Sequence, residues 1–177
     1  MRKIVAGIFV SLDGVAEAPQ DWHFPYFNDE MGEAVGALMS DAETTLLGRT
    51  TYEGFAAYWP DSDDEMAAMM NAQPKVVVST TLENPTWQNT TVVRDLDGVR
   101  ALKERDGGTI GVTGSLVLVR SLLRAGLLDE LHLMIHPIWV GHGERLFDEG
   151  ETVPLTLLKS ETFKTGVLNL TYTRAAS

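Results

Sequence analysis

T-I-G-V-T-G-S-L-V-L-V-R-S-L-L, residues 109–123, is the stretch of sequence that decides the expected fold. Its first five residues are β-branched, apolar or glycine and predict a short strand. The apolar run from Leu116 to Leu123, interrupted by a single charge, predicts a helix. Gly114 permits a sharp turn between the two, and Ser115 is expected to cap the helix with its side chain. A helix N-terminus behind a glycine is a natural anion site, although an ordinary strand-to-helix turn has the same sequence.

A second strand-glycine-helix junction lies earlier in the chain. Thr44 to Gly48 predicts a short strand, and the residues after it form a helix start. Thr50 followed by Glu53 three residues later matches a capping box. Arg49 stands beside the expected helix N-terminus, and an arginine can contact phosphate through two nitrogens. The alternative is a capped helix with a surface arginine that binds nothing.

The remaining chain alternates between short apolar runs and amphipathic runs. This order predicts one α/β domain over residues 1–177, with a mostly parallel sheet, helices on both faces and a C-terminal antiparallel hairpin. The other expected strands are Lys3–Val10, Pro74–Thr80, Thr90–Val93 and Leu131–Pro137, with a hairpin of Leu155–Phe163 and Val167–Thr173; the other expected helices are Asn28–Met39, Glu65–Asn71 and Leu96–Arg105.

Composition narrows the classes of partner. The 177 residues carry a net charge of -11 and no cysteine. An acidic surface repels nucleic-acid backbones and anionic membranes, so neither partner is expected. Without cysteine there is no disulfide, no thiol catalysis and no thiolate metal site. The N-terminal run Ile4–Val10 is short and ends in a polar turn, which favours a first strand and a cytoplasmic protein over a signal peptide.

Several catalytic signatures are missing, including a GxGxxG fingerprint, a Walker P-loop and a GxSxG elbow. His132 and His136 stand four residues apart on one expected strand, roughly 13 Å, so no metal site is expected. What remains is two helix N-termini behind glycines, Arg49, and the hydroxyls of Ser79 and Thr80 after a third strand. In an open α/β sheet these features meet at the carboxyl ends of the strands. Two adjacent anion sites suit the pyrophosphate of a dinucleotide.

Several motifs carry a family resemblance. Met1–Gly14, Trp22–Pro25, Leu47–Glu53 and Gly111–Ser115 resemble the dihydrofolate-reductase-like superfamily. G-L-L-D-E-L at 126–131, His136-Pro137 and G-H-G-E-R-L-F at 141–147 resemble more specifically the reductase domain of riboflavin biosynthesis and its stand-alone relatives. The similarity covers almost the whole chain in the same order. It implies a dihydrofolate-reductase-like three-layer fold that binds NADPH.

The resemblance also implies which residues hold the cofactor. Arg49 matches the residue that meets the 2′-phosphate, and the neighbouring threonines match those that meet the pyrophosphate. Ser79 and Thr80 match the segment beside the 2′-phosphate and adenine, while Ala6 and Gly7 match the strand at the nicotinamide. The full expected set is Ala6, Gly7, Gly48, Arg49, Thr50, Thr51, Ser79, Thr80, Thr113, Gly114, Ser115 and Leu116.

The implied activity is hydride transfer from NADPH to a C=N or C=O group of a small pteridine- or pyrimidine-like substrate. It would be similar to that of 5-amino-6-(5-phosphoribosylamino)uracil reductase. Candidate proton donors are Asp13, Asp29 and Glu30, among which the sequence does not choose. Candidate substrate contacts are Trp22, His23, Phe27 and Arg145. The alternative is a binding protein that holds a pterin, flavin or drug-like ligand without turnover.

An assembly is also expected. The strand from Leu131 to Pro137 and the closing hairpin carry apolar residues on both faces, more than one helix layer can easily cover. The resemblance implies a homodimer as well. We therefore expect a two-fold dimer that buries this region.

Overall fold

One eight-stranded sheet forms the centre of the molecule in the computed structural model, which describes residues 1–176. The strands are β1 (Ile4–Ser11), β2 (Ala42–Gly48), β3 (Lys75–Val78), β4 (Thr90–Val93), β5 (Thr109–Thr113), β6 (Glu130–His136), β7 (Leu155–Thr162) and β8 (Leu168–Arg174). Their spatial order is β4-β3-β2-β5-β1-β6-β8-β7. The first six strands pair in parallel, and β8 and β7 pair antiparallel. The predicted α/β class and the closing antiparallel hairpin are confirmed.

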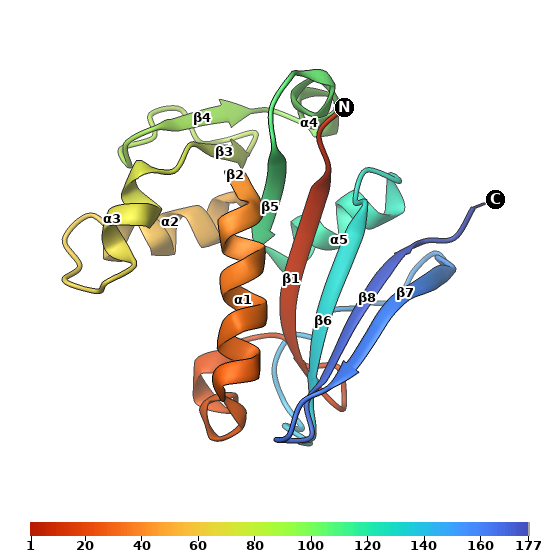
Figure 1. Cartoon of the computed structure of the whole chain (residues 1–177). Coiled ribbons are helices and arrows are strands. Elements are labelled where there is room, and N and C mark those ends of the chain that lie inside the picture. Colours follow the sequence, from red (N-terminus) through yellow and green to blue (C-terminus); the bar gives the residue numbers. More distant parts are fainter. Residues whose placement is uncertain (177) are drawn as a thin grey trace.

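Helices cover both faces of this sheet (Figure 1). They are α1 (Asp29–Asp41), α2 (Arg49–Tyr58), α3 (Ala67–Ala72), α4 (Leu96–Glu104) and α5 (Leu116–Arg124), with two short 3-10 turns at Pro19–Asp21 and Phe24–Tyr26. The larger core lies between the sheet and helices α4 and α5. Two smaller clusters lie on the opposite face, one under α1 and one under α2 and α3. The predicted order of elements along the chain is confirmed.

Alternation along the strands produces these two faces. Leu46 belongs to the core under α5, whereas its neighbour Leu47 packs against α2 and α3. In the same way, Leu133 belongs to the larger core and Met134 packs under α1. Successive side chains of a strand point to opposite faces, so a strand buried on both sides is apolar throughout.

Two helices begin with a side-chain cap. Asn28 accepts a hydrogen bond from the backbone N–H of Met31 at 3.0 Å and caps α1. Asp95 accepts one from Gly98 at 2.9 Å and caps α4. Each bond satisfies one of the free amides of a first helical turn.

The caps expected at the two junctions are wrong. The helix α2 begins at Arg49 with Gly48 as its N-cap, so Thr50 lies inside the first turn and forms no capping box. Glu53 pairs instead with the guanidinium of Arg49 at 2.9 Å. Ser115 does precede α5, but its side chain makes no capping bond to that helix. Its backbone is left-handed, with φ 54°, and its hydroxyl contacts a different element.

The expected reason for a dimer is only partly correct. Most of β6 is already covered within one chain, since Leu131, Leu133 and Met134 are each at most 5% exposed. In contrast, β7 is exposed along nearly its whole length at the edge of the sheet. Within residues 1–176, no helix has the length and hydropathy needed to span a membrane.

Candidate functional site

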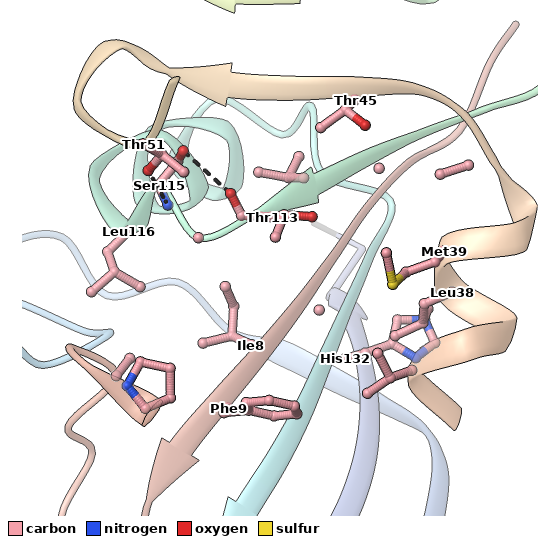
Figure 2. A pocket seen from close by; sticks show the side chains of 18 of the residues that line it. Ile8, Phe9, Leu38, Met39, Thr45, Thr51, Thr113, Ser115, Leu116 and His132 are labelled. Atoms are coloured by element: carbon pink, nitrogen blue, oxygen red, sulfur yellow. Dashed lines mark hydrogen bonds between the residues drawn. The ribbon is translucent and has the colours of Figure 1, made fainter. Parts of the chain in front are cut away.

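The two strand-glycine-helix junctions lie side by side because β2 and β5 are neighbours in the sheet. Two hydrogen bonds join them. The backbone N–H of Gly48 donates to Ser115 Oγ at 2.9 Å, and the backbone N–H of Ser115 donates to Thr51 Oγ1 at 3.1 Å. Figure 2 shows Thr51, Ser115 and Thr113 gathered at this point. The N-termini of α2 and α5 therefore form a single composite corner.

This corner presents the backbone amides of two helix N-termini, although the chain as a whole is acidic. The first amides of a helix have no carbonyl one turn earlier to bond, and the helix dipole adds partial positive charge there. The two helices are long enough for this effect, with 10 residues in α2 and 9 in α5. Gly114 and Ser115 both adopt left-handed backbone conformations, with φ 59° and φ 54°, and these make the sharp turn. The corner is a suitable place for a phosphate.

A cavity of about 480 Å³ opens beside this corner, on the face of the sheet that carries α1 and α2. This volume falls within the range of small-molecule sites, roughly 300–1,000 Å³. Two glycines form part of the cavity floor on the sheet. Gly7 on β1 and Gly111 on β5 both line the cavity and have no side chains to occupy it. A Cβ at Gly7 would come within 3.0 Å of Leu38 on α1, so a side chain there would narrow the space.

Most of the remaining lining is apolar. Strands supply Val5, Phe9 and Met134, and helices supply Val35, Leu38, Met39, Phe55 and Met70. Polar side chains come from Gln20, Thr45, Thr51, Gln73, Thr113 and Ser115. The ionisable side chains in the lining are Glu17 and His132. An apolar cavity with a few fixed polar groups is typical of a ligand site.

Half of the expected cofactor residues line this cavity. They are Gly7, Thr51, Thr113, Gly114, Ser115 and Leu116. Gly48 lies directly behind them, bonded to Ser115. Ala6 is fully buried on the opposite face of β1, in the core under α5, so its side chain does not face the cavity.

The residues expected around the 2′-phosphate and adenine lie outside the lining. Arg49 and Thr50 are exposed at the start of α2. Ser79 is buried, and its hydroxyl accepts hydrogen bonds from the backbone N–H groups of Thr81 and Leu82 at 3.2 and 3.0 Å. Thr80 is exposed. Their roles in cofactor binding stay predictions.

None of the three candidate proton donors lines the cavity. Asp13 accepts hydrogen bonds from the Ser11 hydroxyl at 2.5 Å and from the backbone N–H groups of Val140 and Gly141 at 3.1 and 2.8 Å. The Ser11 bond above all lowers the pKa of Asp13 to about 2. A carboxyl group that stays ionised and fully engaged is a poor proton donor. The structure thus gives Asp13 a bracing role between two loops.

The two carboxylates at the start of α1 also face elsewhere. Asp29 is exposed. Glu30 borders a second, acidic hollow between α1 and β7–β8. There it accepts hydrogen bonds from the backbone of Lys164 and from Asn28, and the Lys164 bond is the main reason that its pKa is lowered.

The four candidate substrate contacts are likewise absent from the lining. Trp22 and His23 are buried, with the Trp22 indole N–H donating to the carbonyl of Glu17 at 3.2 Å. Phe27 is 52% exposed. Arg145 donates from Nε to the carbonyl of Asp13 at 3.0 Å. The loop that carries Trp22 and His23 does reach the cavity, through residues 16–20.

Trp22 and His23 belong to an aromatic cluster that supports the cavity wall. The ring of His23 stacks on Phe9, which lines the cavity, with centroids 4.7 Å apart. His136 packs edge-on against Phe9 and Trp22. Burial lowers the pKa of both histidines, so both favour the neutral form. This cluster fixes Phe9 from behind.

Sequence reasoning missed the two ionisable residues of the lining. His132 enters the sequence analysis only through its spacing from His136, and that spacing does not predict a place in a cavity wall. Glu17 lies in a loop, and no local pattern marked it. Within residues 1–176, no three histidine, aspartate or glutamate side chains cluster closely enough to hold a metal ion.

The fold defines an α/β protein of the dihydrofolate-reductase-like class, and its cavity reaches from the carboxyl end of β5 across the sheet to α1. The model of the RibD C-terminal domain matches residues 2–169, so the chain belongs to that family. The resemblance seen in the sequence is thereby confirmed.

Individual relatives agree with this assignment. The uncharacterized protein YyaP of Bacillus subtilis (strain 168) is 29% identical, covering 97% of this chain and 94% of YyaP. A solved pyrimidine reductase-like protein from Corynebacterium diphtheriae has a TM-score of 0.70 at 16% identity, covering 99% of this chain and 92% of its own. Dihydrofolate reductase from Enterococcus faecalis, solved with NADP(H), has a TM-score of 0.66 at 18% identity, covering 98% and 97%. At these identities the two structures share the fold.

Proposed function

We propose that this protein is an NADPH-dependent reductase that transfers hydride to a C=N or C=O group of a small pteridine- or pyrimidine-like compound. One observation carries the proposal. The N-termini of α2 and α5 are joined through Ser115 at the mouth of an apolar cavity, and that cavity extends over Gly7. This arrangement puts an anion site and a dry cleft next to each other, as a dinucleotide requires. Membership of a reductase domain family supports the same reading.

The residues present fit NADPH. The free amides of α2 and α5 would hold the pyrophosphate, helped by the Thr51 hydroxyl beside Ser115. Arg49 would contact the 2′-phosphate. Its ion pair with Glu53 is exposed and contributes little free energy, so Arg49 could exchange Glu53 for the phosphate. Gly7 lines the cavity and has no side chain of its own to occupy it. When bound, NADPH supplies the hydride.

The chain itself contributes positioning more than acid-base chemistry. Leu38 and Met39 on α1 cover the cavity and exclude water, while Phe9 is braced by the histidine cluster behind it. Holding two reactants in register within a dry site is a large part of catalysis for such a reaction. Because Asp13, Asp29 and Glu30 lie outside the lining, none of the three is expected to protonate the substrate directly.

The test measures binding and turnover separately. Quenching of tryptophan fluorescence by NADPH reports binding without any substrate. Loss of the reduced nicotinamide absorbance in the presence of pterins, aminopyrimidines and aldehydes reports turnover. We expect both signals, and a protein that binds neither NADPH nor NADH would overturn the proposal.

A specific observation also supports the second candidate, a binding protein for a pterin, flavin or drug-like ligand. The three carboxylates considered as proton donors are all absent from the cavity lining. Such a protein would bind its ring compound equally well with and without NADPH, and would oxidise no NADPH with any compound of the panel.

A further inference from the structure

The cavity has two chemically distinct ends (Figure 2). One, the polar end, is formed by Thr51, Thr113 and Ser115 at the helix N-termini. The other, the apolar end, lies between β1, β6 and α1 and is formed by Phe9, Val35, Leu38, Met39, His132 and Met134. If the polar end holds the cofactor phosphates, the apolar end is left for the substrate. The inference below therefore rests on the proposed function.

The side chains of the apolar end offer mainly flat and aliphatic surfaces. Phe9 is fixed by its stack on His23, at 4.7 Å between ring centroids. Leu38 and Met39 extend into the same cavity from α1, as Figure 2 shows. A planar ring between an aromatic and an aliphatic wall buries apolar area on both of its faces, which is the main favourable term in such binding.

His132 adds to this end a ring whose nitrogens are already engaged. One nitrogen, Nε2, lies 3.1 Å from a carboxylate oxygen of Glu130, and Nδ1 lies 3.2 Å from the hydroxyl of Thr171. A neutral imidazole satisfies both contacts, donating to Glu130 and accepting from Thr171. Glu130 is in turn paired with Lys3 at 2.8 Å. His132 is therefore anchored as a wall of the cavity.

The charges around this end disfavour an anionic ligand. Of the lining side chains, all within the described part of the chain, none is a lysine or arginine. The lining carboxylate, Glu17, belongs to the loop at residues 16–20, outside the apolar end, and accepts a hydrogen bond from the backbone N–H of Glu144 at 2.6 Å. The cation linked to the apolar end through Glu130 and His132 is Lys3, and it is already paired with Glu130 at 2.8 Å.

We propose that the apolar end takes a flat, uncharged ring compound that carries no phosphate. A phosphate placed there would lose its hydration without gaining a cation, and an unpaired buried charge is strongly unfavourable. The substrate class therefore differs from the phosphoribosyl compounds implied by the riboflavin-pathway resemblance. A ring with uncharged polar edges, such as a pterin or a free aminopyrimidine, matches the lining.

The test compares two compounds that differ by one phosphate. The probes are 5-amino-6-ribosylaminouracil and its 5′-phosphate, with 6-methylpterin as a ring that carries no sugar. Dissociation constants are measured by titration calorimetry, with and without saturating NADP⁺. We expect the dissociation constants of the uncharged compounds to be lower than that of the phosphate by about tenfold or more. Only the phosphate group would lose its hydration without gaining a cationic partner. Equal or tighter binding of the phosphate, or no binding of either uncharged compound, would overturn the proposal.

A pair of variants locates the effect. Leu38→Arg brings a cation into the apolar end, whereas Ala37→Arg adds the same charge to the neighbouring position of α1, outside this cavity. We expect Leu38→Arg to raise the relative affinity for the phosphate and Ala37→Arg to leave it unchanged. An equal change in both variants would show that the ring binds elsewhere. Leu38→Ala, which adds no charge, should weaken all uncharged rings and covers the case in which the arginine variant unfolds.

Failure of this inference can be told apart from failure of the proposed function. Binding of NADPH to the wild-type protein, read from tryptophan fluorescence, depends on the phosphate contacts of the polar end. A protein that binds NADPH but prefers the phosphorylated ring keeps the reductase proposal and loses this one. A protein that binds uncharged rings but no NADPH loses the reductase proposal and keeps the ring specificity of the apolar end.

Discussion

At the scale of single residues, Asp13 braces two loops. Its carboxylate accepts three hydrogen bonds, and the bond from the Ser11 hydroxyl is the largest cause of a pKa of about 2. An unfolded aspartate titrates near 3.9. Because the folded pKa is depressed, the ionised carboxylate stabilises the fold above about pH 4, and this contribution is lost as the pH falls through about 2.

We expect Asp13→Asn to lower the melting temperature at pH 7 and to flatten the decline of the melting temperature between about pH 4 and 2. Thermal unfolding of the wild type and the variant, followed by circular dichroism across that range, measures both effects. Asp63→Asn, at an exposed loop position, is the control. Parallel curves for wild type and Asp13→Asn would contradict the bracing role.

Arg49 is the residue on which the choice between NADPH and NADH should depend. In a chain of net charge -11, the extra phosphate of NADPH needs a local cation. Hydrogen bonds to a charged group are worth roughly 1.5–3 kcal/mol, about ten- to a hundred-fold in affinity. Arg49→Ala should therefore weaken NADPH binding by about that factor and leave NADH binding almost unchanged. The preference of the wild type should also shrink as salt rises.

The control is Arg100→Ala, which removes another half-exposed arginine, one that pairs within α4 to Asp97 at 3.5 Å. It should change neither affinity. Dissociation constants for both cofactors, measured by fluorescence titration, decide the matter. If Arg49→Ala weakens NADH as much as NADPH, then Arg49 contacts the shared pyrophosphate or supports only the fold.

At the scale of elements, the β5–α5 junction depends on Gly114. Its φ of 59° is left-handed, and a Cβ there would lie 3.2 Å from Thr51 Cγ2. Gly114→Val should therefore push α5 away from α2, separate the paired helix N-termini and abolish NADPH binding while the fold is retained. A fluorescence titration with NADPH and a circular dichroism spectrum are the two measurements.

Gly166→Val is the matched control for backbone strain. Gly166 also has a positive φ, 87°, but it lies in the β7–β8 turn, away from the cavity. It should lower stability and leave NADPH affinity unchanged. Normal NADPH affinity in Gly114→Val would mean that this junction is an ordinary turn.

The two strand-glycine-helix junctions also show which structural features can be predicted from local sequence and which cannot. The strands and helices around them were predictable because their signals are periodic and local, and β5 matches residues 109–113. The caps of these helices were not predictable, because the Ser115 hydroxyl accepts a hydrogen bond from the backbone N–H of Gly48, 67 residues earlier in the chain. A side chain that can cap its own helix can equally bond a neighbouring element, and only tertiary structure decides between them.

The site shows the same division. Gly7, Thr51 and the segment Thr113–Leu116 were expected from the family resemblance, and they line the cavity. Their contact with a cofactor stays a prediction. Trp22 and His23 were expected at a ligand because they are aromatic loop residues, yet they pack behind Phe9. Aromatic side chains occur both in protein cores and in ligand sites. The presence of Trp22 and His23 in a loop therefore could not show which of these two environments they occupy.

At the scale of the whole molecule, the β7 edge of the sheet is unpaired and exposed within the described residues. β7 pairs with β8 on one side, and among the described residues no strand pairs with its other side. Leu157 and Leu158 on this strand are 50% and 55% exposed. A long edge strand with exposed leucines is a template for strand pairing, which soluble proteins normally block or cover.

We therefore expect a two-fold homodimer formed through β7. An antiparallel pairing centred on Ser160 would set Lys159 opposite Glu161 of the partner subunit, and opposite charges across strands are favourable. Sedimentation at micromolar concentration should give twice the chain mass of 19.4 kDa. Leu157→Glu should shift the protein to monomer, because a carboxylate would be buried without a partner, whereas Met66→Glu, near α3 at the opposite end of the sheet, should not. A wild-type protein that sediments at 19.4 kDa would leave β7 an exposed edge and exclude this dimer.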